Sequence, residues 1–220
     1  MFKTETHLHV SEVSRCARLT AAEMVEQYRA KGYTTLIVTD HFSKNTIEHW
    51  GSPDLISHLG IQFRGYEAAK AAAVGTGMHI QCGTEISLNT TPNHYLLYGF
   101  TLEFLARPDL LDLTVEELYA YAKAHGVYMV QAHPYRDEKC HPTFDFVDAV
   151  EGYNSNPRHE NYTQRTVALA KKYGKPVTSG SDAHLPEDVA GGGILTSTAI
   201  QTVEEYIRAL QTGNFEPIIH

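Results

Sequence analysis

Short apolar runs rich in β-branched residues alternate along the chain with segments in which apolar residues recur at the period of a helix. The apolar runs predict buried strands, and the periodic segments predict helices. The expected strands lie at the N-terminus and within residues 33–42, 78–87, 94–100, 127–136, 145–154 and 175–184. The expected helices lie within residues 21–31, 64–75, 114–126, 160–174 and 202–213, and residues 193–200 and 215–220 flank the last of them.

Local signals mark the ends of two of these helices. Thr20 is followed three residues later by Glu23, and Thr114 by Glu117, which is the spacing of a capping box. Gly32 stands where the first helix is expected to stop. The boundaries of these helices therefore follow from side-chain chemistry as well as from periodicity.

Strands joined by helices are typical of an α/β protein with a mainly parallel sheet. The pattern contains about seven βα-like units and is shorter than a standard eightfold barrel of ~250 residues. Only a short turn separates the strands expected at 78–87 and 94–100, so no helix connects these two. No linker or internal repeat divides the chain, which indicates a single domain over residues 1–220.

The composition is that of an ordinary globular protein, with 42% hydrophobic and 20% charged residues. No stretch approaches the roughly 18 consecutive apolar residues of a membrane span, and the start lacks a signal-peptide core. We therefore expect a cytoplasmic protein that does not bind membranes. Its three cysteines, Cys16, Cys82 and Cys140, are far apart and without CxxC spacing, so they predict neither disulfides nor a thiolate zinc site.

A net charge of −8 argues against nucleic acid as a partner, because its 18 basic residues are scattered rather than gathered into one run. The unusual feature is the 13 histidines. At neutral pH most histidines are uncharged and can serve as ligands or proton carriers.

Several of these histidines and two carboxylates fall at the C-terminal ends of expected strands. Parallel strands deliver their last residues to one common face, where barrel enzymes build their active sites. The residues so placed are His7, His9, His41, Glu85, His133, Asp182 and His184. His94 stands at the start of its strand, where the preceding turn can fold it back over the same rim. Histidines 49, 58, 79, 125, 141, 159 and 220 are expected to be structural.

The spacing within this set favours metal binding. His7 and His9, and likewise Asp182 and His184, stand two positions apart, so each pair projects from the same face of a strand. An isolated pair of this kind is more often two solvent-facing side chains than a metal site. The clustering of the whole set reverses that expectation, and imidazole with carboxylate suits Zn, Mn or Fe.

The order of these motifs resembles that of the PHP family, the hydrolase domain of polymerases and histidinol phosphatases. The matching stretches are HLH, TDH, the glutamate of GTEIS, HYLLYGF, AHPYR, EGYN and GSDAH. The resemblance implies a distorted (β/α)7, TIM-like barrel and two or three divalent ions at the strand ends. It implies one ion on His7, His9, Glu85 and Asp182, a second on His41 and His184, and a third that Glu85 bridges to His94 and His133.

The chain departs from the family pattern after its first motif. Similar proteins usually have an Asp or His several residues after HxH as another ligand of the second ion. Here the stretch reads SEVSRCA, with Ser14, Arg15 and Cys16. Glu12 is a candidate substitute ligand, and Arg15 is instead a candidate anion clamp.

Further residues are candidates for contact with substrate or ligands. A guanidinium can take two phosphate oxygens at once, and Arg136 follows AHPY at the rim while Arg158 follows the sixth strand. Asp40 either orients a ligand imidazole or caps the following turn. Asn154 and Asn156 either donate to substrate or belong to an ordinary turn.

The leading function is a metal-dependent phosphatase that acts on a small phosphorylated metabolite, similar to histidinol phosphatase. A metal cluster suits phosphoester hydrolysis because it activates water and neutralises phosphoryl charge. A nuclease or phosphodiesterase would use the same metals but needs a basic track. An amidohydrolase typically has a metal-bridging lysine at a strand end, which is absent from the strand ends expected here. A non-catalytic, metal-binding regulatory domain is a further alternative, which Arg15 supports.

Overall fold

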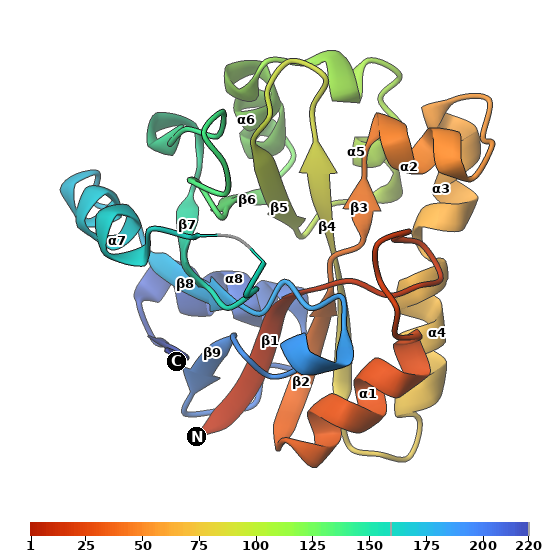
Figure 1. Cartoon of the computed structure of the whole chain (residues 1–220), viewed down its shortest axis with the longest axis vertical. Coiled ribbons are helices and arrows are strands. Elements are labelled where there is room, and N and C mark those ends of the chain that lie inside the picture. Colours follow the sequence, from red (N-terminus) through yellow and green to blue (C-terminus); the bar gives the residue numbers. More distant parts are fainter. Residues whose placement is uncertain (159, 220) are drawn as a thin grey trace.

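The computed structural model describes residues 1–158 and 160–219, and its sheet curls into a nearly closed barrel (Figure 1). The strands are β1 (Phe2–Leu8), β2 (Tyr33–Val38), β3 (His41–Phe42), β4 (His79–Ser87), β5 (His94–Tyr98), β6 (Tyr128–Ala132), β7 (Ala149–Asn154), β8 (Val177–Gly180), β9 (Ile194–Thr196) and β10 (Glu216–Pro217). Their order in the sheet is β10-β9-β1-β2-β4-β5-β6-β7-β8, with β3 paired to β4. The expected α/β, TIM-like barrel is confirmed.

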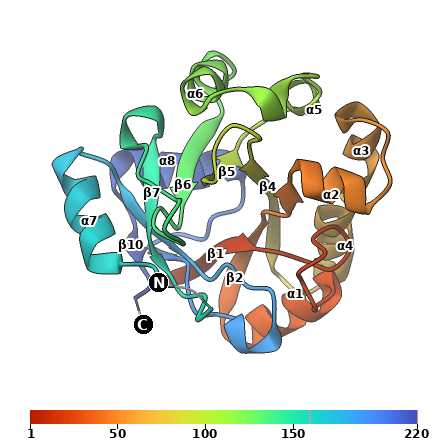
Figure 2. The same cartoon turned by 45° about the horizontal axis from the view of Figure 1, so that its top comes forward.

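The helices lie around the outside of these strands (Figure 2). They are α1 (Ala21–Ala30), α2 (Lys44–His49), α3 (Leu55–Gln62), α4 (Arg64–Ala73), α5 (Leu102–Leu105), α6 (Val115–Ala124), α7 (Thr163–Lys172) and α8 (Val203–Thr212). In the described part of the chain, none of them has the length and apolar character needed to cross a membrane.

Both capping boxes form as the sequence predicts. The Thr20 side chain accepts from the Glu23 amide at the start of α1, and Thr114 accepts from Glu117 at the start of α6. The side-chain carboxylate of each glutamate accepts a hydrogen bond from the backbone amide of its cap residue. The two helices therefore begin where the sequence places them.

The segment 43–57, for which the sequence pattern predicts neither a strand nor a helix, contains helix α2 and the start of helix α3. Ser43 and Asp54 cap these helices through their side chains, which accept backbone hydrogen bonds from residues three positions later. Ile47 and Leu55 bury their side chains in the core. Helices this short hold too few apolar positions to show a helical period, which is why the sequence pattern missed them.

Strand β5 breaks the parallel order of the barrel. It runs antiparallel to both β4 and β6, whereas β1, β2 and β4 are parallel to one another, as are β6, β7 and β8. In register, His94 at the start of β5 lies opposite Ser87 and Ala132 at the ends of its two neighbours. His94 thus reaches the same rim as the other ligand candidates because its strand is reversed.

The barrel closes where the end of β1 meets the segment after β8. The His9 amide donates to the Ala183 carbonyl at 3.0 Å, and the Asp182 amide donates to the His7 carbonyl at 2.8 Å. Gly180 allows this closure, because a Cβ at that position would collide with the His7 side chain on β1. The two motifs HLH and DAH are thereby joined directly through their backbones.

Candidate metal centre

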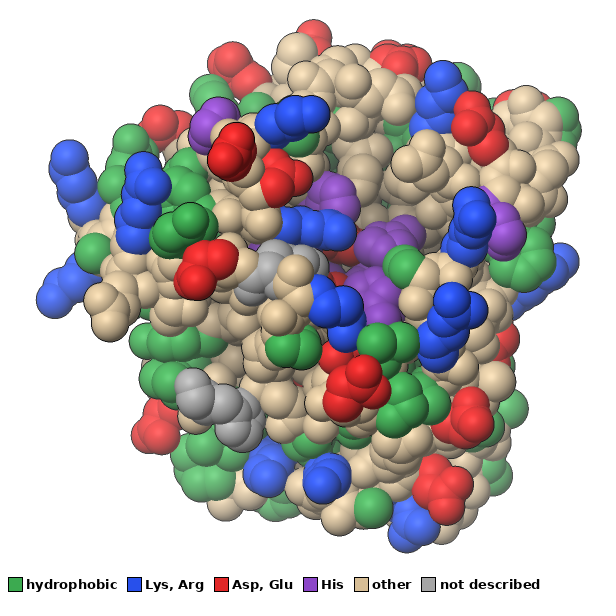
Figure 3. Space-filling model, viewed as in Figure 1, with side chains coloured by type: hydrophobic (Ala, Val, Ile, Leu, Met, Phe, Trp, Pro, Cys, Tyr) green, Lys and Arg blue, Asp and Glu red, His purple; other side chains and the backbone are tan. Residues whose placement is uncertain are grey.

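Eight side chains converge at the rim of the barrel, from the strand ends and the segments that follow them. They are His7, His9, His41, Glu85, His94, His133, Asp182 and His184, and they form four overlapping groups whose ligand atoms lie within 4.8 Å of one another. Figure 3 shows histidines gathered in a hollow near the middle of this face, with basic side chains around it. The structure brings together every residue of the set that the strand-end argument selected.

The first set of ligands, here called the inner group, consists of His7, His9, Glu85 and Asp182. His7 Nε2 lies 3.1 Å from His9 Nε2, 3.4 Å from Asp182 Oδ1 and 3.7 Å from Glu85 Oε1. The four side chains are at most 3% exposed. This is the set that the family resemblance implied for one ion.

The hydrogen bonds of His7 show that a cation fits this group. Its Nδ1 lies 2.8 Å from Glu151 Oε1, which requires Nδ1 to carry the proton and donate it. In the neutral ring Nε2 then presents a lone pair toward the oxygens of Asp182 and Glu85. Lone pairs and carboxylate oxygens repel one another unless a positive charge lies among them. The donor set therefore suits a divalent ion.

Glu85 lies at the centre of the whole arrangement. Its Oε1 is 2.9 Å from both His94 Nδ1 and His133 Nε2, and its Oε2 is 2.7 Å from His41 Nδ1. Oε2 is fully buried, yet it accepts no hydrogen bond of acceptable geometry within the described residues. Each oxygen thus faces a different set of nitrogens, which is the arrangement of a bridging ligand.

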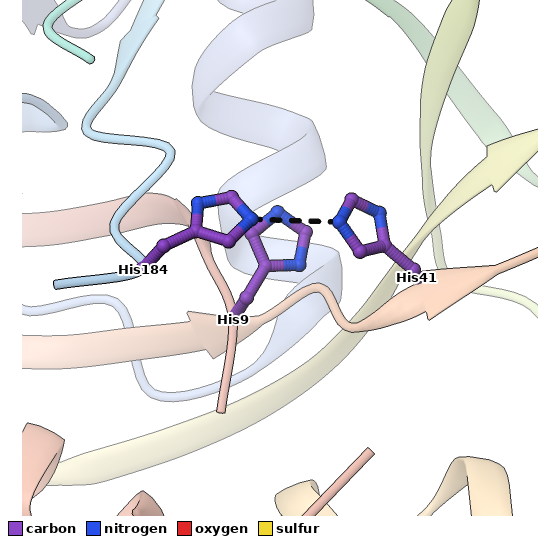
Figure 4. Close-up of side chains that lie close together, drawn as sticks. All are labelled: His9, His41 and His184. Carbon is purple, nitrogen blue, oxygen red and sulfur yellow. Dashed lines mark hydrogen bonds between the residues drawn. The ribbon is translucent and has the colours of Figure 1, made fainter. Parts of the chain in front are cut away.

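A second cluster, here called the outer group, consists of His41, His184 and Cys16. His184 Nε2 lies 3.4 Å from His41 Nε2, and Cys16 Sγ lies 3.2 Å from the same His41 atom. Figure 4 shows the rings of His41 and His184 directed toward each other across His9. The His9 ring stacks on both, at centroid distances of 4.1 and 4.4 Å, and so separates the inner group from the outer group.

Burial and charge shift the pKa values of these ligands in opposite directions. Burial lowers the pKa of His7, but the charges of Glu151, Asp182 and Glu85 outweigh it and raise this pKa well above its usual value. Burial raises the pKa of Glu85, whereas the charges of His94, His41 and His7 hold it well below its usual value. Glu85 is therefore ionised, and its buried negative charge favours the binding of cations at the centre.

The pKa values of Cys16 and His41 in the outer group are also shifted, in opposite directions. Burial raises the pKa of Cys16, but hydrogen bonds to His184 and His41 outweigh this effect and lower it to about 6. Burial lowers the pKa of His41, but the Glu85 charge and the Cys16 thiol outweigh it and raise it to about 10. The cysteine and the histidine thus stabilise each other as thiolate and imidazolium. The sequence analysis did not select Cys16, since a single cysteine carries no spacing signal.

Two ligand candidates have left-handed backbone conformations. His133 has φ of 28° and Asp182 has φ of 51°. Such conformations cost a non-glycine residue on the order of 1–3 kcal/mol and occur mainly at functional sites. Hydrogen bonds hold them in place: the His133 amide donates to Glu151 Oε2, and the Asn156 side chain donates to the Asp182 carbonyl.

Two buried carboxylates behind the ligands were missed by the sequence analysis. Glu151, on β7, accepts from His7 with one oxygen and from the His133 amide with the other. Glu5, on β1, accepts from the amides of His7 and Ser181 at 3.0 Å each. The signal for Glu151 was an acidic residue within a mainly apolar run, in the EGYN stretch of the family resemblance. Glu5 lies in a polar strand and gave no such signal.

Asp40 acts on a ligand imidazole through Ser14 rather than directly. The Ser14 hydroxyl donates to Asp40 Oδ1 at 2.7 Å, and its oxygen lies 3.4 Å from His9 Nδ1. Asp40 Oδ1 also accepts from the Val10 amide, and burial raises the Asp40 pKa to about 7. Of the two roles considered for Asp40, the contacts favour the orientation of His9.

Four of the candidate residues are already engaged by other protein groups. Glu12 accepts from the Ala21 amide at 3.0 and 3.1 Å, so it caps helix α1 and does not join the metal cluster. Arg158 forms a two-point ion pair with Asp188, at 2.8 and 2.6 Å. Asn154 donates to Glu151, which supports a ligand rather than a substrate. Asn156, bound to Asp182, has the same supporting position.

A cleft of about 770 Å³ opens beside His41 and His94, and its lining includes Arg15, Arg18 and Arg136. Arg136 Nη1 lies 3.4 Å from His94 Nδ1, so this guanidinium touches the edge of the ligand cluster. A cleft of this size suits a small-molecule ligand. Of the histidines expected to be structural, His159 and His220 lie outside the described residues.

Comparisons with known proteins support this architecture. A family model described as PHP-associated matches residues 161–215, about a quarter of the chain. A comparison with curated proteins found no match. Among solved structures, a two-domain Bacteroides vulgatus protein containing a PHP-like metal-dependent phosphoesterase is similar, with a TM-score of 0.74 and 14% identity. The match covers 100% of this chain and 65% of that one.

Two further solved structures share the fold. PsfC from Pseudomonas syringae has a TM-score of 0.68 at 21% identity, over 100% of this chain and 91% of that one. The lesion-specific endonuclease Q from Pyrococcus furiosus has a TM-score of 0.62 at 16% identity, over 98% of this chain and 57% of that one. The chain thus spans less than two thirds of the Bacteroides protein and of endonuclease Q.

Proposed function

The chain has the fold and the ordered motifs of the PHP family, and from that premise we propose that it is a metal-dependent phosphatase acting on a small phosphomonoester. The proposal combines three features of the rim: a donor set that suits divalent ions, a set of buried residues that orient the donors, and a basic cleft beside them. Each feature has a separate role in the proposed reaction.

The proposed ligands of the metal centre are the eight residues of the rim. The inner group would hold one ion, and His41 with His184 would hold a second. Glu85, His94 and His133 would be the ligands at a third position. When bound, such ions supply hydroxide at neutral pH and neutralise charge on the phosphoryl oxygens.

The protein's own contribution is to orient the donors. Glu151 accepts the Nδ1 proton of His7, so Nε2 is the atom that His7 would offer to an ion of the inner group once it gives up its own proton. Asp40 orients the Ser14 hydroxyl, which in turn faces His9 Nδ1. These orienting contacts are made by protein groups alone.

The observation that carries the choice of substrate is the position of the arginines. Arg15, Arg18 and Arg136 line a cleft that is bounded on one side by His41 and His94. A phosphate bound beside these histidines can receive charge-assisted hydrogen bonds from Arg136, which already contacts His94. The net charge of −8 leaves the rest of the surface poorly suited to a long polyanion.

A nuclease or phosphodiesterase is the second candidate, and the similarity to endonuclease Q favours it. That protein's activity belongs to its whole chain, of which this fold covers 57%. A polynucleotide would also need basic contacts beyond the cleft, and the acidic composition does not favour them. We therefore rank it second and test it beside the first.

The experiment compares three substrates at equal concentration, with Zn, Mn or Fe added to the purified protein. They are p-nitrophenyl phosphate, bis(p-nitrophenyl) phosphate and an oligonucleotide duplex that carries an abasic lesion. We expect release of phosphate from the monoester only, and loss of that activity on chelation. Cleavage of the diester or the duplex without monoester hydrolysis would replace the phosphatase with the nuclease. No turnover of any of the three with ions bound would leave a metal-binding domain.

A further inference from the structure

We propose that Cys16 supplies a thiolate ligand to the ion of the outer group, which then has one sulfur and two imidazole donors. The inference rests on the proposed metal centre and extends it, because that ligand set contains only nitrogen and oxygen. The three donor atoms are Cys16 Sγ, His41 Nε2 and His184 Nε2.

The distances among these atoms fit a single tetrahedral ion. Ligands that bind at about 2.0–2.3 Å around such an ion lie about 3.3–3.8 Å from one another. His41 Nε2 lies 3.4 Å from His184 Nε2, within this range, and 3.2 Å from Cys16 Sγ, just below it. His184 lies close enough to Cys16 to help lower the pKa of the thiol. Three donors leave the fourth position open, as in catalytic zinc sites.

The loop that carries Cys16 is fixed to the elements that carry the two histidines. The Arg18 amide donates to the His184 carbonyl at 2.8 Å, which ties the loop to the segment after β8. The Trp50 indole donates to the Val13 carbonyl at 2.9 Å, which ties it to the end of helix α2. The position of the thiol beside both imidazoles is therefore set by backbone contacts.

A buried carboxylate on the other side of His41 provides an independent observation. Glu85 Oε2 is 2.7 Å from His41 Nδ1, and the Glu85 side chain is fully buried. The negative charge of a carboxylate beside Nδ1 favours a proton on that atom, which leaves Nε2 as the ligand atom. Nε2 is the atom that faces Cys16.

A thiolate ligand changes which ions the outer group prefers. Sulfur is a soft donor and favours Zn, Co or Fe over Mn or Mg. Cys16 is exposed, so in the metal-free protein the thiol is open to reagents and oxidants. Metal binding then has two measurable consequences, a sulfur-to-metal absorption band and protection of the thiol.

The first experiment uses Co²⁺ as the probe in the full-length protein. For wild type we expect a thiolate-to-cobalt charge-transfer band in the near ultraviolet. Cys16→Ala should lose this band and should bind about one equivalent less cobalt than wild type. Cys16→Asp, which offers an oxygen donor instead, should recover the cobalt but not the band. The control is Cys82→Ala with Cys140→Ala, which should keep both, since these thiols hydrogen-bond to the Gly83 and Pro92 carbonyls.

The second experiment needs no substitution, so it holds even if a variant fails to fold. Iodoacetamide should modify Cys16 at least tenfold more slowly in zinc-loaded wild type than in the chelated protein, as followed by peptide mass spectrometry. Equal rates, or a cobalt protein without the band, would overturn the proposal. Neither readout involves hydrolysis, so a band in a protein without phosphatase activity would refute the proposed function and support the thiolate.

Discussion

The inner and outer groups of the metal centre are built in different ways. The inner group, His7, His9, Glu85 and Asp182, is almost completely buried and lies at the ends of β1, β4 and β8. In the outer group the side chains of His41 and His184 are 18% and 13% exposed, and Cys16 comes from a surface loop. One group thus belongs to the barrel itself and the other to its rim.

This difference teaches how the two groups keep their geometry. Inner donors are fixed by carboxylates and amides that are themselves buried, such as Glu151 and Asn156. Of the outer donors, Cys16 comes from a loop, and Cys16 and His41 line the cleft that we assign to substrate. Substitution of a residue that supports one group should therefore lower metal affinity in that group alone. Substitution of a residue shared by both groups should lower it throughout the centre.

Glu85 is the shared residue, so Glu85→Gln should have the largest effect. Its two oxygens face His94 and His133 on one side and His41 on the other. An amide keeps the shape but loses the negative charge, and it cannot bridge two cations. We expect a fall of at least about a hundredfold in kcat together with loss of bound metal, measured by phosphate release and elemental analysis.

The matched control for this variant is Glu67→Gln. Glu67 is an exposed residue on helix α4 that pairs with Lys70 at 3.4 Å, so its loss should change neither metal content nor kcat. Full metal occupancy and activity within about threefold of wild type in Glu85→Gln would sink the bridging role.

Glu151→Gln should separate the two groups. Glu151 accepts from His7 Nδ1 and from the His133 amide, and it makes no contact in the outer group among those described for it. Residues that orient a ligand in this way typically change metal affinity by about 10- to 100-fold. Titration with graded chelators should show a lower affinity for the ions assigned to His7 and His133, while the Co²⁺ band assigned to Cys16 persists. An equal fall in the affinity of the outer group would contradict the separation of the groups.

The difference between ligands at strand ends and ligands on loops also explains how much of the centre could be predicted from the sequence. Ends of parallel strands share a face, so His7, Glu85 and Asp182 could be grouped from strand order alone. His94 needed knowledge of strand direction, since it lies at the rim only because β5 is antiparallel. The helical connections were predicted where capping boxes and periodicity agree, and were missed in the short helices α2 and α3.

Loop conformation accounts for the residues that the sequence did not reveal. Cys16 and Glu12 both lie in the stretch after HLH, and either was chemically able to be a ligand. Only the path of the loop decides between them, by directing Cys16 to His41 and Glu12 to the start of α1. The role of Glu151 was hidden for another reason, because a buried carboxylate acts through a partner that is 144 positions away in sequence.

Arg136→Ala should affect substrate without affecting either group. The guanidinium contacts His94 and lines the cleft, so its removal takes away a charge-assisted contact with phosphate. We expect kcat/KM to fall by about tenfold or more, with unchanged metal content. Steady-state kinetics with p-nitrophenyl phosphate, beside elemental analysis, provides the measurement. Unaltered kinetics would mean that Arg136 is a surface residue with no role in substrate binding.

Arg158→Ala is the matched comparison and should have the smallest kinetic effect. Its guanidinium is already engaged by Asp188, which also accepts from the His184 and Leu185 amides and so keeps two partners after the substitution. We expect kcat/KM within about threefold of wild type and a loss of about 1 kcal/mol in the free energy of unfolding, measured in denaturant.

The stability difference should also depend on pH. Burial raises the Asp188 pKa, but Arg158 and the two amides outweigh the effect of burial and lower this pKa. A carboxyl with a lowered pKa contributes stability above its ordinary pKa and loses it in acid, so the difference between the two proteins should vanish at low pH. A large rise in KM at neutral pH with unchanged stability would instead assign Arg158 to the substrate.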